Sequence, residues 1–130
     1  MFGYKDRVTI ENLEGKTLIN VEKYDDEKII FETEDENVYR MYHRQDCCER
    51  VRVASIRGDL NKLANETVSH TSKSTFDNET PPSAPSYEPY DSFTWTIFEI
   101  ETESGEKVSI WWIGESNGYY YEGVDIAKIS

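Results

Sequence analysis

Short segments of alternating apolar and polar residues recur along this chain of 130 residues. The clearest is 92–102, where Phe93, Trp95 and Ile97 alternate with smaller or polar residues. Successive side chains of a strand point to opposite faces of a sheet, so a period of two is typical of strands. The apolar residues change phase at Phe98, which predicts a β-bulge near Ile97. The chain is predicted to have an all-β fold, mainly an antiparallel meander that forms a twisted sheet or an open barrel, with one short helix.

The same reasoning places strands along most of the chain, at 7–10, 16–22, 28–33, 38–43, 51–56, 67–72, 92–102, 107–113 and 119–129. Residues 34–37 separate two of these segments and have the length of a hairpin loop. The short helix is predicted at 58–65, with Asp59 as its cap and with Leu60 and Leu63 facing the core. Antiparallel strands joined by short turns therefore account for most of the sequence.

The length of the chain predicts a single domain, 1–130, with one proline-rich loop at 76–91. All four prolines of the chain fall in this loop, namely Pro81, Pro82, Pro85 and Pro89. Proline favours extended and solvated backbone, so we expect a mobile surface segment between two strands.

Charge is distributed unevenly along the chain, whose formal net charge is −12. Residues 1–37 carry 11 acidic and 5 basic side chains, and residues 76–130 carry 11 acidic and 2 basic ones. Residues 38–75, in between, carry 4 acidic and 7 basic side chains. A protein of this charge lacks the lysine and arginine that displace counterions from bare nucleic acid, so direct binding to nucleic acid is excluded. The two acidic thirds suit a partner with a basic surface, or they serve solubility alone.

The sequence begins without an apolar signal segment, and no run of residues has the length of a membrane span. We therefore expect a cytoplasmic protein with no membrane contact. The adjacent cysteines Cys47 and Cys48 are predicted to be reduced thiols that are buried for structural reasons. Three alternatives for them are a vicinal disulfide ring, a zinc site that also draws on His43, Asp46 and Glu49, and a redox or nucleophilic role. No cofactor and no metal are predicted.

The candidate ligand-binding or partner-binding side chains come from two stretches of the chain, 38–59 and 111–125. They are Arg50, Arg52, Arg57, Glu115, Asn117, Tyr119, Tyr120 and Tyr121. Guanidinium groups suit phosphate or carboxylate, and tyrosine-rich turns make good recognition surfaces. The alternative is that the arginines form ion pairs across the sheet and that Tyr119 and Tyr121 face the core from a hairpin at 114–121.

The strings Q-D-C-C-E at 45–49 and G-E-S-N-G-Y-Y at 114–120 are distinctive. Together with K-I-I-F-E-T at 28–33 and Y-D-S-F-T-W-T at 90–96, they make the chain resemble a family of small uncharacterised phage and prophage proteins. The resemblance runs from about Gly15 to Ile129. It implies a phage-encoded protein of the host cytoplasm and carries no catalytic assignment.

Three hypotheses for the function follow. The favoured one is a non-catalytic phage protein that inhibits a host defence protein through its acidic surface, with residues 99–106 or 25–27 as the contact. The second is a sponge that sequesters a nucleotide-like signalling molecule in an arginine and tyrosine pocket. The third is an enzyme that depends on Cys47 or Cys48, for which no nucleophile–base pair is apparent. A homo-oligomer is left open.

Overall fold

A computed structural model describes residues 6–86 and 91–130. Within these residues the fold contains nine strands and two short 3₁₀ turns, and it has no α-helix. The strands are β1 (Arg7–Val8), β2 (Thr17–Tyr24), β3 (Lys28–Thr33), β4 (Val38–Tyr42), β5 (Arg50–Arg57), β6 (Glu66–Asp77), β7 (Ser92–Thr102), β8 (Lys107–Ser116) and β9 (Asp125–Lys128). The all-β prediction is confirmed.

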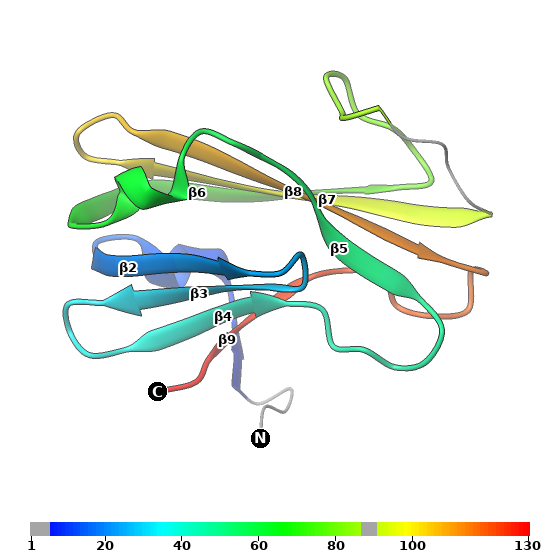
Figure 1. Cartoon of the computed structure of the whole chain (residues 1–130), viewed down its shortest axis with the longest axis horizontal. Coiled ribbons are helices and arrows are strands. Elements are labelled where there is room, and N and C mark those ends of the chain that lie inside the picture. The colour runs from blue at the N-terminus through cyan, green and yellow to red at the C-terminus, as the bar shows by residue number, and fades with distance from the viewer. Residues whose placement is uncertain (1–5, 87–90) are drawn as a thin grey trace.

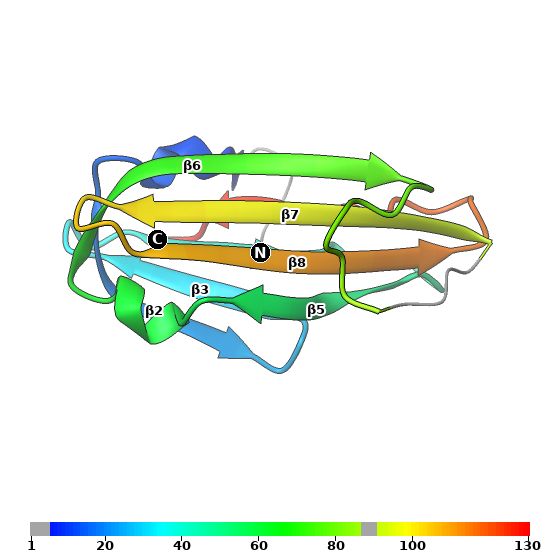
Figure 2. The same ribbon diagram turned by 90° about the horizontal axis from the view of Figure 1, so that it is seen from above.

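The strands are hydrogen-bonded in the order β1-β9-β4-β3-β2-β6-β7-β8-β5, and every pair is antiparallel. The sheet folds over where β2 meets β6, a junction that pairs Thr17 with Thr67 and Leu18 with Glu66. Two layers result, with β2, β3, β4 and β9 in one and β6, β7 and β8 in the other (Figure 1). Strand β5 lies at the edge of the second layer, beside β8 (Figure 2).

The main core lies between the two layers and takes apolar side chains from both. Its largest members include Phe31, Tyr39 and Trp112, each no more than 2% exposed. The indole N–H of Trp112 donates to the sulfur of Met41 at 3.3 Å, which joins β8 to β4 across the core. Burial of aromatic area on this scale compensates for the low overall content of apolar residues.

A second apolar cluster covers the other face of β7 and β8, and its buried members are Phe93, Trp95, Ile97, Trp111 and Ile113. The predicted β-bulge near Ile97 is wrong, because β7 pairs with β8 without a register shift from Ser92 to Glu101. The change of phase at Phe98 has a different cause. The apolar residues in the first half of β7 pack in the outer cluster. Phe98 and Ile100, in the second half, pack in the main core.

The segment that follows β6 covers part of this outer cluster. Phe76 belongs to β6 and packs on the cluster, as does Ala84. The guanidinium of Arg57 stacks over the ring of Trp111 at 4.2 Å and donates to the carbonyl of Ser83. The described part of the proline-rich loop, 78–86, is thus attached to the sheet, while residues 87–90 lie outside the described residues.

Two local predictions need correction. The short helix after β5 is a 3₁₀ turn over Leu60–Leu63, in which Asp59 accepts a hydrogen bond from the N–H of Asn61 as the predicted cap. The segment 114–121 is no hairpin, because β8 ends at Ser116 and the next strand, β9, pairs with β4 and β1 in the other layer. Residues 117–124 therefore form a connection between the layers, which we call the crossover loop.

Candidate functional site

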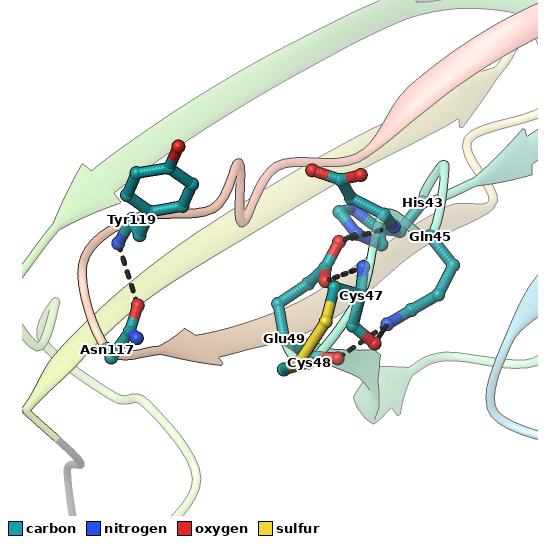
Figure 3. The surroundings of a disulfide bond; sticks show 8 residues. His43, Gln45, Cys47, Cys48, Glu49, Asn117 and Tyr119 are labelled. Atoms are coloured by element: carbon teal, nitrogen blue, oxygen red, sulfur yellow. Dashed lines mark hydrogen bonds and ion pairs between the residues drawn. A yellow bond between two sulfur atoms is a disulfide. The ribbon is translucent and has the colours of Figure 1, made fainter.

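One end of the fold collects most of the unusual side chains. There the crossover loop, the β4–β5 connection and the adjoining ends of β5 and β8 meet (Figure 3). Arg50 pairs with Glu115 in the β5–β8 ladder, and His43 Nδ1 lies 2.7 Å from the carbonyl oxygen of Gly123. The structure thus brings together the stretches 38–59 and 111–125.

Cys47 and Cys48 are joined by a disulfide and are exposed. The prediction of buried, reduced thiols is wrong for this structure. The residues lie in the connection between β4 and β5 rather than in a strand, so their side chains are not forced to opposite faces of a sheet. Because both sulfurs are oxidised, neither is available here as a thiolate nucleophile or metal ligand.

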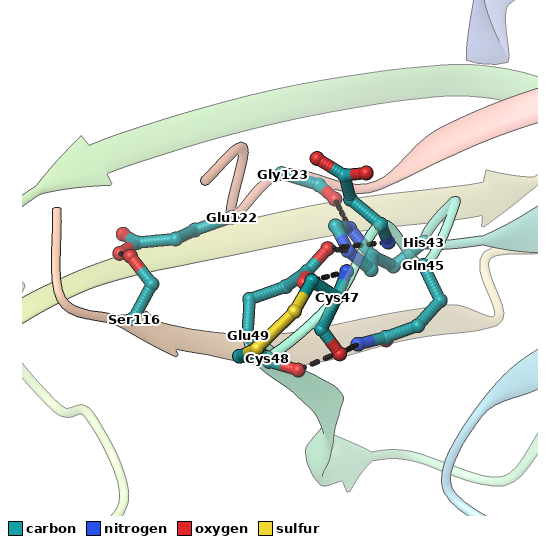
Figure 4. A network of polar contacts seen from close by, with 9 residues as sticks. His43, Gln45, Cys47, Cys48, Glu49, Ser116, Glu122 and Gly123 are labelled. Carbon is teal, nitrogen blue, oxygen red and sulfur yellow. Dashed lines mark hydrogen bonds and ion pairs between the residues drawn. A yellow bond between two sulfur atoms is a disulfide. The ribbon is translucent and has the colours of Figure 1, made fainter. Parts of the chain in front are cut away.

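The Glu49 carboxylate organises the backbone around the disulfide. Its side chain is fully buried and accepts hydrogen bonds from the backbone N–H groups of Asp46 at 2.8 Å and Cys47 at 2.9 Å. It also lies 2.7 Å from Nε2 of His43 (Figure 4). Burial alone would raise the pKa of Glu49, but the hydrogen bonds from His43 and from these two N–H groups outweigh it and lower the pKa to about 2.

The His43 ring is buried between two acceptors, with its side chain 3% exposed. A carbonyl oxygen can only accept, so Nδ1 must donate to Gly123. Nε2 lies 2.7 Å from the Glu49 carboxylate, so His43 links the β4–β5 connection to the crossover loop through contacts at both ring nitrogens.

His43 and Glu49 were absent from the predicted binding residues. Their spacing of six residues fits no recurring metal or catalytic motif, and a glutamate in a polar string gives no sign of burial. Within the described residues, no three side chains of histidine, cysteine, aspartate or glutamate are placed to hold a metal ion.

The three predicted arginines have different surroundings. Arg52 forms an ion pair with Glu115, with Nη1 and Oε1 2.6 Å apart, and Arg57 is held by Trp111 and the loop carbonyl described above. Arg50 is exposed and lines a cavity of about 380 Å³. Among the described residues, ion pairing across the sheet, the alternative considered from the sequence, therefore applies to Arg52 but not to Arg50.

That cavity, which we call the arginine pocket, contains four of the eight predicted residues. Its lining includes Cys48, Arg50, Asp91, Glu115, Asn117 and Tyr120. Asp91, Glu115 and Arg50 line the pocket directly. Arg52 is not among the lining residues, but it pairs with Glu115 and offsets the charge of that carboxylate. The pocket can therefore offer a fork of donors, an amide and an aromatic ring to a small ligand, but it has no excess of positive charge.

The tyrosines of the crossover loop are not core residues, contrary to the alternative considered from the sequence. Tyr119 is 83% exposed and Tyr121 is 52% exposed. Tyr121 stacks on the ring of His43 with centroids 5.9 Å apart, and its hydroxyl donates to Asp125 at 3.2 Å. Asn117 turns the loop by accepting from the N–H of Tyr119 at 3.0 Å.

A family model described as a domain of unknown function, DUF7448, matches residues 11–126. The chain belongs to this family. Membership of DUF7448 agrees with the predicted resemblance to an uncharacterised family and assigns no chemistry to the site. No curated protein and no solved structure matches the chain. Among the residues that the structure describes, no helix is long and apolar enough to cross a membrane.

Proposed function

We propose that this DUF7448 protein is a non-catalytic, phage-encoded binding protein that docks an acidic surface on a basic face of a host protein and inhibits it. The phage origin rests on the resemblance of the Q-D-C-C-E and G-E-S-N-G-Y-Y strings. The host protein is proposed to belong to a defence system of the cytoplasm. The observation that carries the proposal is the way the fold gathers acidic residues from distant parts of the chain.

Six carboxylates gather at the end of the fold opposite the disulfide, and we call this set the acidic end. It comprises Glu34, Asp35, Glu36, Glu66, Glu103 and Glu106. The β2–β6 junction brings them together. The N–H of Glu34 bonds to the carbonyl of Thr17 at 2.8 Å and that of Glu103 to the carbonyl of Thr67 at 2.9 Å, and these two threonines are paired.

Little positive charge offsets the acidic end. Asp35 pairs with Lys16, and the hydrogen bonds from Lys16 and Thr33 lower the pKa of Asp35 to about 2. Within the described residues, no other carboxylate of the set has a basic side chain at ion-pair distance. Like charges held close together by a rigid turn framework repel one another, and a basic partner would relieve that repulsion.

The first prediction concerns charge reversal at this end. A triple variant with Glu34→Lys, Glu36→Lys and Glu103→Lys is expected to lose capture of the host partner from a lysate of the host. Capture by the unaltered protein should fall steeply with added salt, because exposed charges are screened beyond about 8 Å at physiological ionic strength. The captured protein, identified by mass spectrometry, should carry a basic face and lose activity when the purified phage protein is added.

A charge-matched control separates docking from overall charge. The β2–β3 turn, the other contact considered from the sequence, holds Asp25, Asp26 and Glu27 and lies at the far end of β2 from the acidic end, so the proposal sets it aside as the contact. Changing all three to lysine alters the net charge as much as the first variant does. This control should keep the partner. Equal loss of partner capture in both variants would show that net charge alone causes the loss. Unchanged capture by the acidic-end variant would refute the proposed surface.

A second candidate function is the nucleotide sponge, and the arginine pocket is the observation that favours it. The pocket places the Arg50 guanidinium, the Asn117 amide and the Tyr120 ring around one volume. These groups match a phosphate, a base edge and a base face respectively. Asp91 and Glu115 oppose an anion in the same space, which makes this candidate the weaker one.

The second prediction tests the sponge by thermal unfolding. Cyclic and linear nucleotides at millimolar concentration should raise Tm if the pocket binds them, because a ligand of the folded state stabilises it. Arg50→Glu should abolish the increase. Arg57→Glu serves as the control, because Arg57 stacks on Trp111 outside the pocket and should leave the increase intact. No increase with any nucleotide would exclude the sponge.

A further inference from the structure

The disulfide has no role in the functions proposed above, and it adds little to the stability of the fold. It joins Cys47 to Cys48, which are neighbours in the sequence. A disulfide stabilises a protein mainly by restricting the unfolded chain, and this effect grows with the length of the loop that the bond closes. A bond between adjacent residues encloses no other residue. What the pair can contribute is therefore its redox chemistry.

Both cysteines are accessible to a reductant in solution. Each of the two residues is exposed, and they lie in the connection between β4 and β5 at one end of the fold (Figure 3). Thiol–disulfide exchange requires a thiolate to reach one of the two sulfur atoms. This disulfide meets that requirement without any unfolding of the protein.

The oxidised pair is tied to the buried carboxylate of Glu49. The N–H of Cys47 donates to Oε1 of Glu49 at 2.9 Å. The side-chain amide of Gln45 donates to the carbonyl oxygen of Cys47 at 3.2 Å and to that of Glu49 at 2.7 Å (Figure 3). Both backbone polar groups of Cys47 are therefore held by its neighbours. A movement of this residue displaces the Glu49 side chain or breaks its hydrogen bond.

Glu49 connects the pair to the crossover loop. Its Oε2 lies 2.7 Å from Nε2 of His43, whose Nδ1 donates to the carbonyl of Gly123 at 2.7 Å (Figure 4). Tyr121 of the same loop stacks on the His43 ring with centroids 5.9 Å apart. A contiguous set of contacts thus runs from Cys47 through Glu49 and His43 to two positions of the crossover loop.

Breaking the disulfide forces a rearrangement of these contacts. Two sulfur atoms that are no longer bonded separate to van der Waals contact, so the reduced pair takes up more room. Cys47 lies against the hydrogen bonds of Glu49, and Cys48 lines the arginine pocket together with Asn117 and Tyr120 of the crossover loop. The added volume is taken either from the Glu49 contacts or from the pocket, and both border the crossover loop.

We propose that Cys47 and Cys48 form a reversible redox modification site whose state sets the position of the crossover loop. The reductant is a dithiol. One of its thiolates attacks a sulfur of the pair, the S–S bond breaks and a mixed disulfide forms. The second thiol of the reductant then displaces the cysteine and closes the disulfide of the reductant, which leaves two electrons and two protons on the pair. A disulfide of the same class reverses the exchange. The exchange requires neither a basic partner nor a nucleotide, so it is independent of the functions proposed above.

The first test counts thiols in the folded protein. Before treatment a maleimide should label no cysteine, and after dithiothreitol without denaturant it should label two per chain, counted by mass spectrometry of the intact protein. Oxidised glutathione should return the count to none. Labelling that appears only after the protein is unfolded in urea, or a reduction that oxidised glutathione does not reverse, would overturn the proposal.

The second test measures whether reduction reaches the crossover loop. Amide signals in nitrogen–proton NMR spectra are compared between the oxidised and the reduced protein. The signals of Tyr121 and Gly123 should shift together with those of residues 45–49. The β7–β8 turn at 103–106, at the opposite end of the fold, should keep its signals. Shifts confined to 45–49 would contradict the coupling to the crossover loop.

The double variant Cys47→Ser with Cys48→Ser is the matched control for direct effects of the reagents. Serine is close to cysteine in size and forms no disulfide, and both positions are exposed, so the variant should fold. Its crossover-loop signals should match those of the reduced, unaltered protein and should not respond to dithiothreitol. Signals that match the oxidised protein instead would show that the disulfide does not set the position of the loop, and would refute the proposal.

Discussion

Glu49→Gln is expected to lower the free energy of unfolding by about 3 kcal/mol at pH 7, since hydrogen bonds to a charged group contribute about 1.5–3 kcal/mol each and three of them reach this buried carboxylate. Glutamine keeps the size of the side chain but removes the charge that His43 and the N–H groups of Asp46 and Cys47 share. Glu79→Gln is the control, because Glu79 is exposed. Urea unfolding of the two variants measures the difference, and equal small losses would contradict the role of Glu49.

The same carboxylate predicts how stability depends on pH. The pKa of Glu49 is about 2 in the folded protein and has a usual value of 4.5. A carboxyl with a lowered pKa stabilises the folded state fully above its unfolded pKa and loses that contribution as pH falls through the folded pKa. The gap in stability between the natural protein and Glu49→Gln should therefore shrink as pH falls from about 4.5 toward 2.

The role of Glu49 shows where reasoning from the sequence ends. Alternation of apolar residues was enough to place β3, β4, β7 and β8, because the strand period is a local property. The burial of Glu49 and His43 depends on the crossover loop, whose Gly123 carbonyl is 80 residues from His43 along the chain. No local pattern encodes a contact over that separation.

The prediction of a hairpin at 114–121 is wrong for a related reason. Asn-Gly at 117–118 is typical of a hairpin turn, and it does turn the chain, with Gly118 at a φ of +94°. The strand after it, β9, finds its partners β4 and β1 in the other layer. The choice between pairing back on β8 and crossing to the other layer depends on which edge is free, and only the whole fold decides that.

The prediction of a β-bulge in β7 is wrong because both faces of this strand are buried. A strand that is buried on one face shows clean alternation, and a strand buried on both faces loses it. Ile97 packs in the outer cluster and Phe98 in the main core, so the apparent phase shift reflects two cores rather than a bulge. The outer cluster was not predicted, because nothing in the sequence of 92–102 shows that Ala84 from the loop reaches that face.

Gly114→Ala is expected to destabilise the fold by about 3 kcal/mol, at the upper end of the cost of overpacking a core. A β-carbon at this position would overlap the carbonyl oxygen of Glu122 and would lie 2.9 Å from the Cβ of Glu122. Both are fixed parts of the crossover loop, so either β8 or the loop has to move. Gly114 also pairs with Thr94 in β7, so a displaced loop would pull Glu122 away from the Thr94 hydroxyl.

Gly105→Ala distinguishes this overlap from the general cost of replacing a glycine. Gly105 has a φ of +98° in the β7–β8 turn, and a β-carbon there would meet nothing within 4 Å. Its replacement should cost about 1–2 kcal/mol from the left-handed backbone alone. Urea unfolding measures the free energy of unfolding of both variants. An equal decrease in the two would show that the crossover loop moves to accommodate the added methyl group without destabilising the fold.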